Sequence, residues 1–155
     1  GLIMKTKPLH FEVKSYNELT TDQLYNMLQL RAEVFVVEQD CVYQDIDGKD
    51  NIALHVLGYK DKELVAYTRV FPPNTYFEYA SIGRVVVRAS ERKHKYGYDV
   101  MKVSIEAVEK AYKTTTIKIS AQTYLKSFYN HLGFKEVGEG YLEDGIPHIG
   151  MIKTT

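Results

Sequence analysis

A short basic turn carries the residue types best suited to binding an anionic ligand. It follows a β-branched run at residues 82–88 and precedes an amphipathic segment that begins near Gly97. Backbone N–H groups at the start of a helix are unpaired and the helix dipole is positive there, so a strand, a turn and a helix in this order favour a bound phosphate. The cations that strengthen this prediction are Arg92, Lys93, His94 when protonated, and Lys95. A nucleotide-type ligand is the first hypothesis.

Several competing sites are set aside by residue spacing. The chain contains neither Gly-x-x-x-x-Gly-Lys-Ser/Thr nor Gly-x-Gly-x-x-Gly after its first strand, which argues against a P-loop and a dinucleotide fingerprint. The five histidines show no zinc-ligand spacing such as His-x-x-x-His, and the acidic segment 38–51 lacks the glycine and glutamate positions of an EF-hand. The single cysteine, Cys41, excludes an intramolecular disulfide and a multi-cysteine zinc site. We therefore expect no metal.

The composition bounds the class of protein. The 155 residues are enough for one domain, and an apolar content of 45% is enough for one core. Twenty Lys and Arg balance twenty Asp and Glu, which argues against a partner that is nucleic acid or an acidic membrane surface. No apolar run approaches the roughly 20 residues that span a bilayer, and no secretory leader is visible. With one cysteine, the sequence favours the reducing cytoplasm.

Hydrophobic periodicity predicts the elements that hold the basic turn. A capping box at Thr20 and Gln23 begins a helix over residues 21–37, and Gly133 stands where a C-cap glycine would end a helix over residues 124–132. A third helix, residues 97–112, has a wide apolar face suited to packing on a sheet. Strands are expected at residues 10–14, 52–59, 64–71, 80–88, 117–121, 134–141 and 149–153. This order predicts a single α/β (α+β) domain over residues 1–155.

Two motifs in this order resemble the GNAT (Gcn5-related) N-acetyltransferases. The family pattern Val-x-Pro-x-x-Arg/Gln-x-x-Gly-x-Gly/Ala is similar to Val87-Arg-Ala-Ser-Glu-Arg92-Lys-His-Lys95-Tyr-Gly97. The second signature, Tyr-x-x-x-Gly-Phe after a helix, is similar to Tyr129-Asn-His-Leu-Gly133-Phe134. Segments 28–39, 43–48 and 143–151 resemble the ElaA-like branch of the family. The resemblance extends from about residue 24 to residue 153.

The resemblance implies acetyl-CoA as the acyl donor. The fold would be a mixed, mostly antiparallel sheet with helices on both faces, in which the parallel strands 82–88 and 117–121 splay apart and admit the thioester. Backbone groups of Val85, Val86 and Val87 would hold the pantetheine arm. The pyrophosphate would lie on the backbone N–H groups of Arg92, Lys93, His94, Lys95, Tyr96, Gly97 and Tyr98.

The implied reaction is a direct attack on the thioester by a primary amine that belongs to a small molecule or a peptide. No covalent enzyme intermediate is needed, so the protein supplies positioning, a route for the amine proton and an acid for the leaving thiolate. Tyr129 stands at the motif position of that acid, and a phenol with a pKa near ~10 is protonated at neutral pH. Its other interpretation is a core tyrosine on an apolar helix face.

One departure from the motif concerns the phosphate turn itself. Lys95 stands where the first motif glycine usually occurs, and Ala89 replaces the usual proline. Glycine at that point lets the backbone approach phosphate and adopts a positive φ without strain. Lysine adds charge instead. This departure suggests the alternative function, a non-catalytic acyl-CoA-binding or interaction domain on the same fold.

The acceptor side is less defined by the sequence. Asp45, Asp47 and Asp50 would either attract the ammonium group of a substrate or form local turns in a solvated loop. Candidates for relaying the amine proton are His55, His148 and Glu78. Both histidines have an equally simple interpretation as hydrogen-bonded strand residues. The oligomeric state stays open, with a homodimer among the alternatives.

Overall fold

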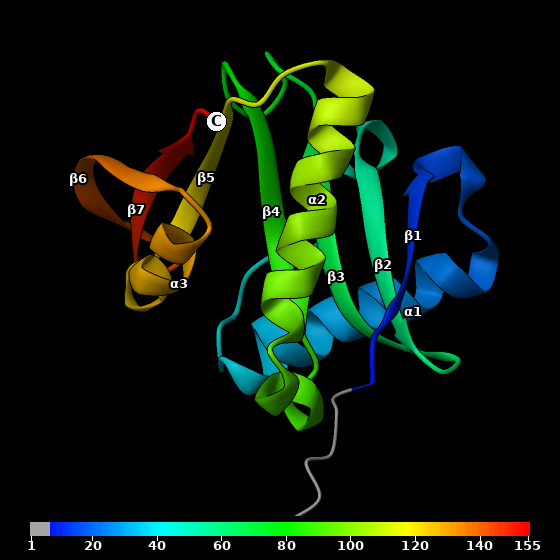
Figure 1. Cartoon of the computed structure of the whole chain (residues 1–155). Helices are drawn as coiled ribbons and strands as arrows, with labels where there is room; N and C mark the ends of the chain where they lie inside the picture. The colour runs from blue at the N-terminus through cyan, green and yellow to red at the C-terminus, as the bar shows by residue number, and fades with distance from the viewer. Residues whose placement is uncertain (1–6) are drawn as a thin grey trace, which may run out of the picture.

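The protein folds around one seven-stranded mixed sheet (Figure 1). The computed structural model describes residues 7–155. The strand order across the sheet is β1-β2-β3-β4-β5-β7-β6, and every neighbouring pair is antiparallel except β4 and β5. The strands are β1 (His10–Ser15), β2 (Leu54–Lys60), β3 (Glu63–Phe71), β4 (Ala80–Val87), β5 (Ile117–Gln122), β6 (Lys135–Glu143) and β7 (Ile146–Lys153). The predicted mostly antiparallel sheet with one parallel pair is confirmed.

Helices cover both faces of this sheet, as predicted. In Figure 1, α2 (Tyr96–Tyr112) lies in front of the strands and α1 (Thr21–Arg31) lies behind them. A short α3 (Lys126–His131) lies beside β5 and β7. Short 3-10 turns occur at Tyr16–Glu18, Asp50–Ile52, Ala89–His94 and Thr123–Leu125.

Two apolar clusters, one on each face, hold the helices to the sheet. Met27 and Leu30 of α1 pack with Leu57 of β2 in the smaller cluster. Val100 and Met101 of α2 belong to the larger cluster. This cluster also contains residues of β2, β3 and β4 that face α2, and residues of β5, α3 and β7. Alternate residues of the same strand therefore enter opposite clusters, as period-two side-chain placement requires.

The helix predicted over residues 21–37 is present, but its last part is wider than an α-helix. The capping box is formed, because Gln23 N donates to Thr20 Oγ1 at 3.1 Å and Thr20 N donates to Gln23 Oε1 at 3.0 Å. After α1 the chain continues as a π-helix, Ala32–Glu38. Short π segments occur often at functional sites. Here the segment brings the end of the helix over the splayed strands.

The β4–β5 pair separates soon after it forms. Only Ala80↔Ile117 and Ser81↔Lys118 are paired, and the strands diverge beyond them (Figure 1). The register of β4 against β3 also shifts, since Tyr67 lies opposite Val86 whereas Arg69 lies opposite Gly83. At this bulge Arg84 has φ +50°, a left-handed conformation that costs a non-glycine residue about 1–2 kcal/mol. The second half of β4 consequently has no strand partner on the β5 side.

The C-terminal hairpin is longer than predicted. Strands β6 and β7 extend to a two-residue turn at Asp144 and Gly145, with φ values of +51° and +77°. Positive φ at both central positions suits a tight hairpin, and an Asp-Gly pair is typical of such a turn. Gly133, with φ +95°, ends α3 as predicted.

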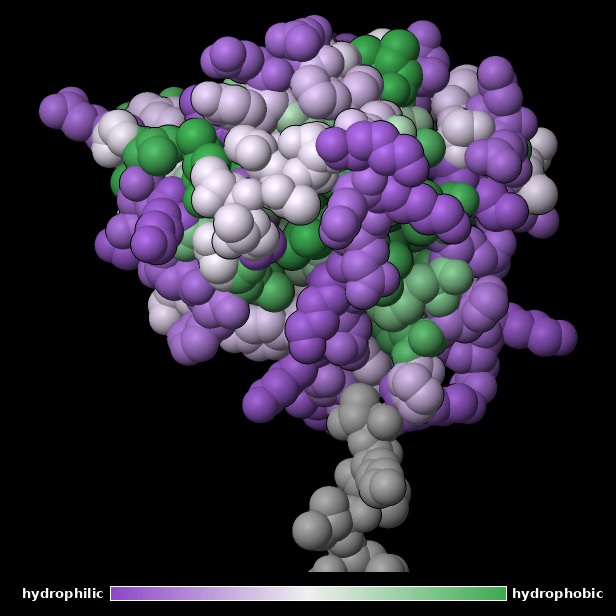
Figure 2. All heavy atoms as spheres, turned by 45° about the horizontal axis from the view of Figure 1, so that its top comes forward, coloured by the Kyte–Doolittle hydropathy of each residue, from purple (hydrophilic) through white to green (hydrophobic). Residues whose placement is uncertain are grey.

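On the face shown in Figure 2, hydrophilic side chains predominate and the apolar areas are small and separate. Within residues 7–155 none of the helices has the length and apolar character needed to cross a bilayer.

Candidate functional site

A cleft follows the gap between β4 and β5 and consists of two adjoining cavities. The donor cavity, about 450 Å³, lies toward the basic turn and α2. The acceptor cavity, about 140 Å³, lies toward the β6–β7 turn, the end of β3, the β3–β4 loop and β4. Both cavities are lined by Phe35, Gln39, Val85, Gln122, Leu125 and Tyr129. These six residues mark the junction of the two halves.

The donor cavity is lined by seven of the ten residues predicted to bind the cofactor. They are Val85, Val86, Val87, Arg92, Lys95, Gly97 and Tyr98. The other three, Lys93, His94 and Tyr96, do not line it. The hydroxyl of buried Tyr96 donates to the backbone oxygen of Lys7 at 2.6 Å, and His94 packs on its ring. The N–H of Tyr98 donates to Lys95 O at 3.1 Å, so this N–H is already paired.

Lys95 adopts the conformation for which the family motif uses glycine. Its φ and ψ are +61° and +27°, and it occupies the N-cap of α2. The turn thus keeps its left-handed residue and adds an exposed side-chain cation at the helix N-terminus. Gly97, two residues later, packs tightly, because a Cβ there would lie 3.3 Å from the ring of Phe128.

Arg92 holds the turn to two other elements. Its Nε donates to Val87 O at 3.0 Å, and its Nη2 donates to Glu38 Oε1 at 2.8 Å. It therefore joins the end of β4 to the end of the π-helix. The Arg92 side chain acts as a positioning group for the turn.

Tyr129 lies at the junction of the two cavities, on α3. Its side chain is 6% exposed, and its ring makes edge contacts with Phe128 and Phe134, with centroids 5.0 Å and 6.0 Å apart. Burial raises the pKa of the Tyr129 phenol, with a smaller contribution from nearby Tyr124 in the same direction. A phenol that stays protonated at neutral pH is the form that can donate a proton.

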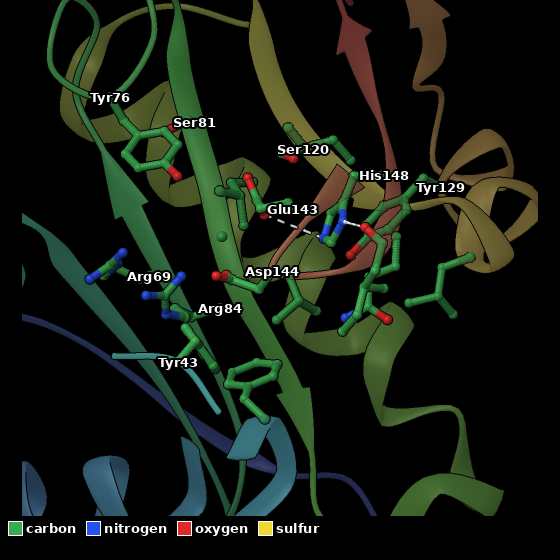
Figure 3. Close-up of a pocket in the computed structure, with 18 of the residues that line it drawn as sticks. Tyr43, Arg69, Tyr76, Ser81, Arg84, Ser120, Tyr129, Glu143, Asp144 and His148 are labelled. Carbon is green, nitrogen blue, oxygen red and sulfur yellow. Dashed lines mark hydrogen bonds and ion pairs between the residues drawn. The ribbon is translucent and has the colours of Figure 1, made fainter. Parts of the chain in front are cut away.

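His148 and Glu143 face each other in the acceptor cavity (Figure 3). His148 Nε2 lies 3.3 Å from Glu143 Oε2, and His148 Nδ1 lies 2.7 Å from Ile146 O. Because a carbonyl only accepts, Nδ1 carries a hydrogen and donates it to Ile146. The neutral imidazole then has its lone pair on Nε2, the nitrogen on the side of Glu143.

The three aspartates predicted to attract an ammonium group are bound by arginines of the protein. Arg31 Nε donates to Asp45 Oδ2 at 2.9 Å, and Arg31 Nη1 donates to Asp50 Oδ1 at 2.8 Å. Arg69 donates to Asp47 and Asp50 at 2.7–2.9 Å, and Arg84 Nε donates to Asp45 Oδ1 at 2.8 Å. We call these six residues the Arg–Asp cluster.

This pairing changes the interpretation of Asp45, Asp47 and Asp50. Asp45 and Asp50 are buried, and burial of a carboxylate is tolerated only when it is paired. Although burial acts in the opposite direction, the hydrogen bonds and charge of Arg69 and the charge of Arg84 lower the pKa of Asp47. The hydrogen bonds and charges of Arg31 and Arg69 likewise lower the pKa of Asp50. The alternative of a solvated acidic loop does not fit either. The carboxylates hold the loop to β3, β4 and α1, and none of the three lines the acceptor cavity.

Two further candidates also lie outside the cleft lining. His55 is fully buried, with its ring nitrogens 2.6 Å from Tyr67 Oη and 2.8 Å from Asp50 O. Burial, its largest influence, lowers the His55 pKa, so the ring is neutral. Glu78 is exposed and lines neither cavity. Of the predicted acceptor-side residues, the cleft includes His148 alone.

Sequence reasoning missed several residues that form the cleft. Arg69 and Arg84 line the acceptor cavity beside Tyr43 and Tyr76, and Glu143 and Asp144 form its acidic edge (Figure 3). The sequence did contain one signal for the Arg–Asp cluster. Three aspartates of the acidic loop, Asp45, Asp47 and Asp50, can be neutralised by three arginines of neighbouring elements, Arg31, Arg69 and Arg84. Within the described residues 7–155, no three His, Cys, Asp or Glu side chains gather as a metal site would require.

Comparison with known proteins agrees with this geometry. Residues 15–155 match the family described as acetyltransferase (GNAT) domain. The chain is 45% identical over 140 residues to protein ElaA of Escherichia coli strain K12, covering 89% of this chain and 92% of that protein. It is also 39% identical over 145 residues to the Schizosaccharomyces pombe UPF0039 protein C11D3.02c, covering 92% of this chain and 95% of that protein.

Solved structures give the same result. The crystal structure of an acyl-CoA N-acyltransferase from Pseudomonas aeruginosa superposes with a TM-score of 0.88 at 40% identity, covering 94% of this chain and all of that chain. The crystal structure of Escherichia coli ElaA superposes with a TM-score of 0.87 at 42% identity, covering 94% and 99%. This chain therefore belongs to the GNAT family of acyltransferases and to its ElaA-like branch.

Proposed function

We propose that this protein transfers an acetyl group from acetyl-CoA to a primary amine of a small molecule or peptide. The observation that carries the proposal is the continuous cleft between β4 and β5, with a donor cavity and an acceptor cavity that meet at Tyr129. A donor and an acceptor that enter from opposite ends would meet beside its hydroxyl. Holding two reactants in this way supplies much of the rate enhancement of a direct transfer.

The donor cavity suits a CoA molecule in two respects. The second half of β4 has backbone groups free of a β5 partner, and these would pair with the amides of a pantetheine arm along Val85, Val86 and Val87. The turn from Arg92 to Tyr98 adds cations and a helix N-terminus for the pyrophosphate. Lys95 supplies charge while it keeps the left-handed backbone of the motif.

The chemical step needs an acid and a base on opposite sides of the thioester. The amine nitrogen attacks the carbonyl carbon, the C–S bond breaks, and the Tyr129 hydroxyl gives its proton to the departing thiolate. The attacking amine loses a proton to Nε2 of His148, whose orientation is fixed by the Nδ1–H bond to Ile146 O. Glu143 Oε2, 3.3 Å from that nitrogen, accepts a hydrogen bond from the N–H that forms.

The alternative function is an acyl-CoA-binding or interaction domain without catalysis. Such a domain needs the donor cavity but not a buried tyrosine and a histidine–carboxylate pair at the far end of the same cleft. The presence of Tyr129, His148 and Glu143 around the junction and the acceptor cavity favours the enzyme.

Two measurements separate these functions. Calorimetry with acetyl-CoA and with CoA tests binding, and release of free thiol over a panel of primary amines tests turnover. We expect micromolar binding and turnover with at least one amine. Binding without turnover on any amine would favour the binding domain, and absence of binding would contradict both proposals.

A further inference from the structure

The acceptor cavity has unlike charges at its two sides. In Figure 3, Arg69 and Arg84 lie together on one side, near Tyr43, Glu143 and His148 lie on the other, and the Asp144 side chain is drawn between the two sides. The amine chemistry proposed above uses only the Glu143 and His148 side. The function of the arginine side is not explained by acetyl transfer to a simple amine.

The arginines retain hydrogen-bond donors after the Arg–Asp cluster is formed. A guanidinium has five N–H donors, and Arg84 uses Nε and Nη2 on the side chain and backbone oxygens of Asp45. Its Nη1 has no protein partner among the described residues, and the side chain is 20% exposed. Arg69 is 1% exposed, and its buried Nε also lacks a partner in that part of the chain.

The carboxylate oxygens of Asp45 and Asp47, in contrast, are occupied. Asp45 Oδ1 accepts from Arg84 Nε and from Tyr43 Oη at 2.9 Å, and Asp45 Oδ2 accepts from Arg31. Both oxygens of Asp47 accept from Arg69. Three arginines and three aspartates cancel in formal charge, so an incoming anion would be held by the direction of the spare N–H groups and not by net charge.

The backbone supplies an independent observation at Arg84. This residue has φ +50° within the β4 bulge, directly before the strand segment proposed to hold the donor. Glycine or asparagine would occupy this conformation with less strain. Strain of this kind is concentrated at functional sites, and here it points the guanidinium into the acceptor cavity.

We propose that the acceptor carries a carboxylate in addition to its primary amine. The carboxylate binds the Arg84 Nη1 donor beside Arg69, and the amine lies at His148 and Glu143 below the thioester. This inference rests on the proposed acetyl transfer and names the substrate class for it. A cavity of about 140 Å³ has room for a small amino acid.

The test uses matched acceptors that differ only in the carboxylate. Initial rates of thiol release are measured for a series of α- and ω-amino acids, their carboxamides and the corresponding alkylamines. For the wild-type protein we expect kcat/KM to be about 10- to 100-fold higher for the best amino acid than for its carboxamide, the range of a charge-assisted hydrogen bond. Equal kcat/KM values across each matched set would overturn the inference.

Variants at the bulge assign the preference to Arg84. Arg84→Asn tolerates the left-handed backbone but removes the charge, so the preference should fall to about one, and Arg84→Lys should keep part of it. Lys110→Gln, which removes an exposed cation at the far end of α2, is the matched control and should keep the full preference. A preference that survives Arg84→Asn unchanged would contradict the assignment.

A second measurement is independent of the stability of the variants. Simple carboxylates without an amine should inhibit the wild-type protein competitively with the acceptor, and their neutral amides should not. Absence of such inhibition would overturn the inference. The proposed function fails separately, if acetyl-CoA does not bind or if no amine of any kind is acetylated.

Discussion

Replacing Tyr129 with phenylalanine isolates the proposed proton donor from its packing role. The ring packs against Phe128 and Phe134, and both contacts are available to phenylalanine. The hydroxyl has no protein hydrogen-bond partner within residues 7–155, so its removal leaves no buried group unsatisfied. The free energy of unfolding should therefore change by less than about 1 kcal/mol.

The effect on rate should be much larger. Loss of a general acid costs about 100-fold or more in kcat, which corresponds to about 2.7 kcal/mol in activation free energy. The KM for acetyl-CoA should change little, because the hydroxyl acts on the leaving thiolate and not on the bound ground state. Since burial raises the Tyr129 pKa, the wild-type rate should show no alkaline loss from this group up to about pH 10.

The assay is thiol release at saturating acetyl-CoA, with thermal unfolding measured on the same preparation. Tyr25→Phe, a change of an exposed tyrosine on α1, is the matched control and should leave both quantities unchanged. If Tyr129→Phe retains the full kcat over a wide pH range, the assignment of Tyr129 as the acid is refuted. A rate loss matched by a large loss of stability would show instead that the hydroxyl is structural.

Three further predictions concern the turn, the Arg–Asp cluster and the buried His55. Lys95→Gly should raise the free energy of unfolding by up to about 1 kcal/mol, because glycine adopts φ > 0 freely, and should weaken acetyl-CoA binding, most at low salt; calorimetry at two ionic strengths checks this. Arg31→Met should cost about 3–5 kcal/mol in urea unfolding, because it leaves buried carboxylates with fewer partners; a cost under 1 kcal/mol would refute this. Stability should fall below about pH 6.5, where the unfolded chain protonates His55 and the folded chain, with its lowered pKa, does not. A second loss should follow below about pH 4, where the unfolded chain protonates Asp47 and Asp50 and the folded chain, with their lowered pKa values, does not; His55→Gln should remove only the first loss.

Most of the fold could be predicted because its signals are local. The Thr20 capping box, the C-cap at Gly133 and the Asp144–Gly145 turn each depend on a few adjacent residues, and the structure contains all three. The π-helix could not be predicted. Its Val34 packs into the smaller apolar cluster and its Glu38 pairs with Arg92, and no pattern of neighbouring residues reports such long-range contacts.

Most of the lining of the donor cavity was predictable for a related reason. Its backbone turn is encoded within one segment, residues 87–98, so the motif and the structure coincide there. The acceptor side combines β3, β4 and the β6–β7 turn, and no local pattern shows which loop meets which strand. An arginine such as Arg69 in a strand usually indicates an exposed face, and only the folded structure shows that it neutralises Asp47 and Asp50.

The short pairing of β4 with β5 has a mechanical consequence for the protein without ligand. Two residue pairs join these strands, so the sheet lacks a row of interstrand bonds through its middle. An extended amide-containing arm along residues 85–87 would form backbone hydrogen bonds to β4 in the place of the missing strand pairing. Binding of the ligand would then raise the free energy of unfolding. Above the dissociation constant, this increase grows with the logarithm of the ligand concentration.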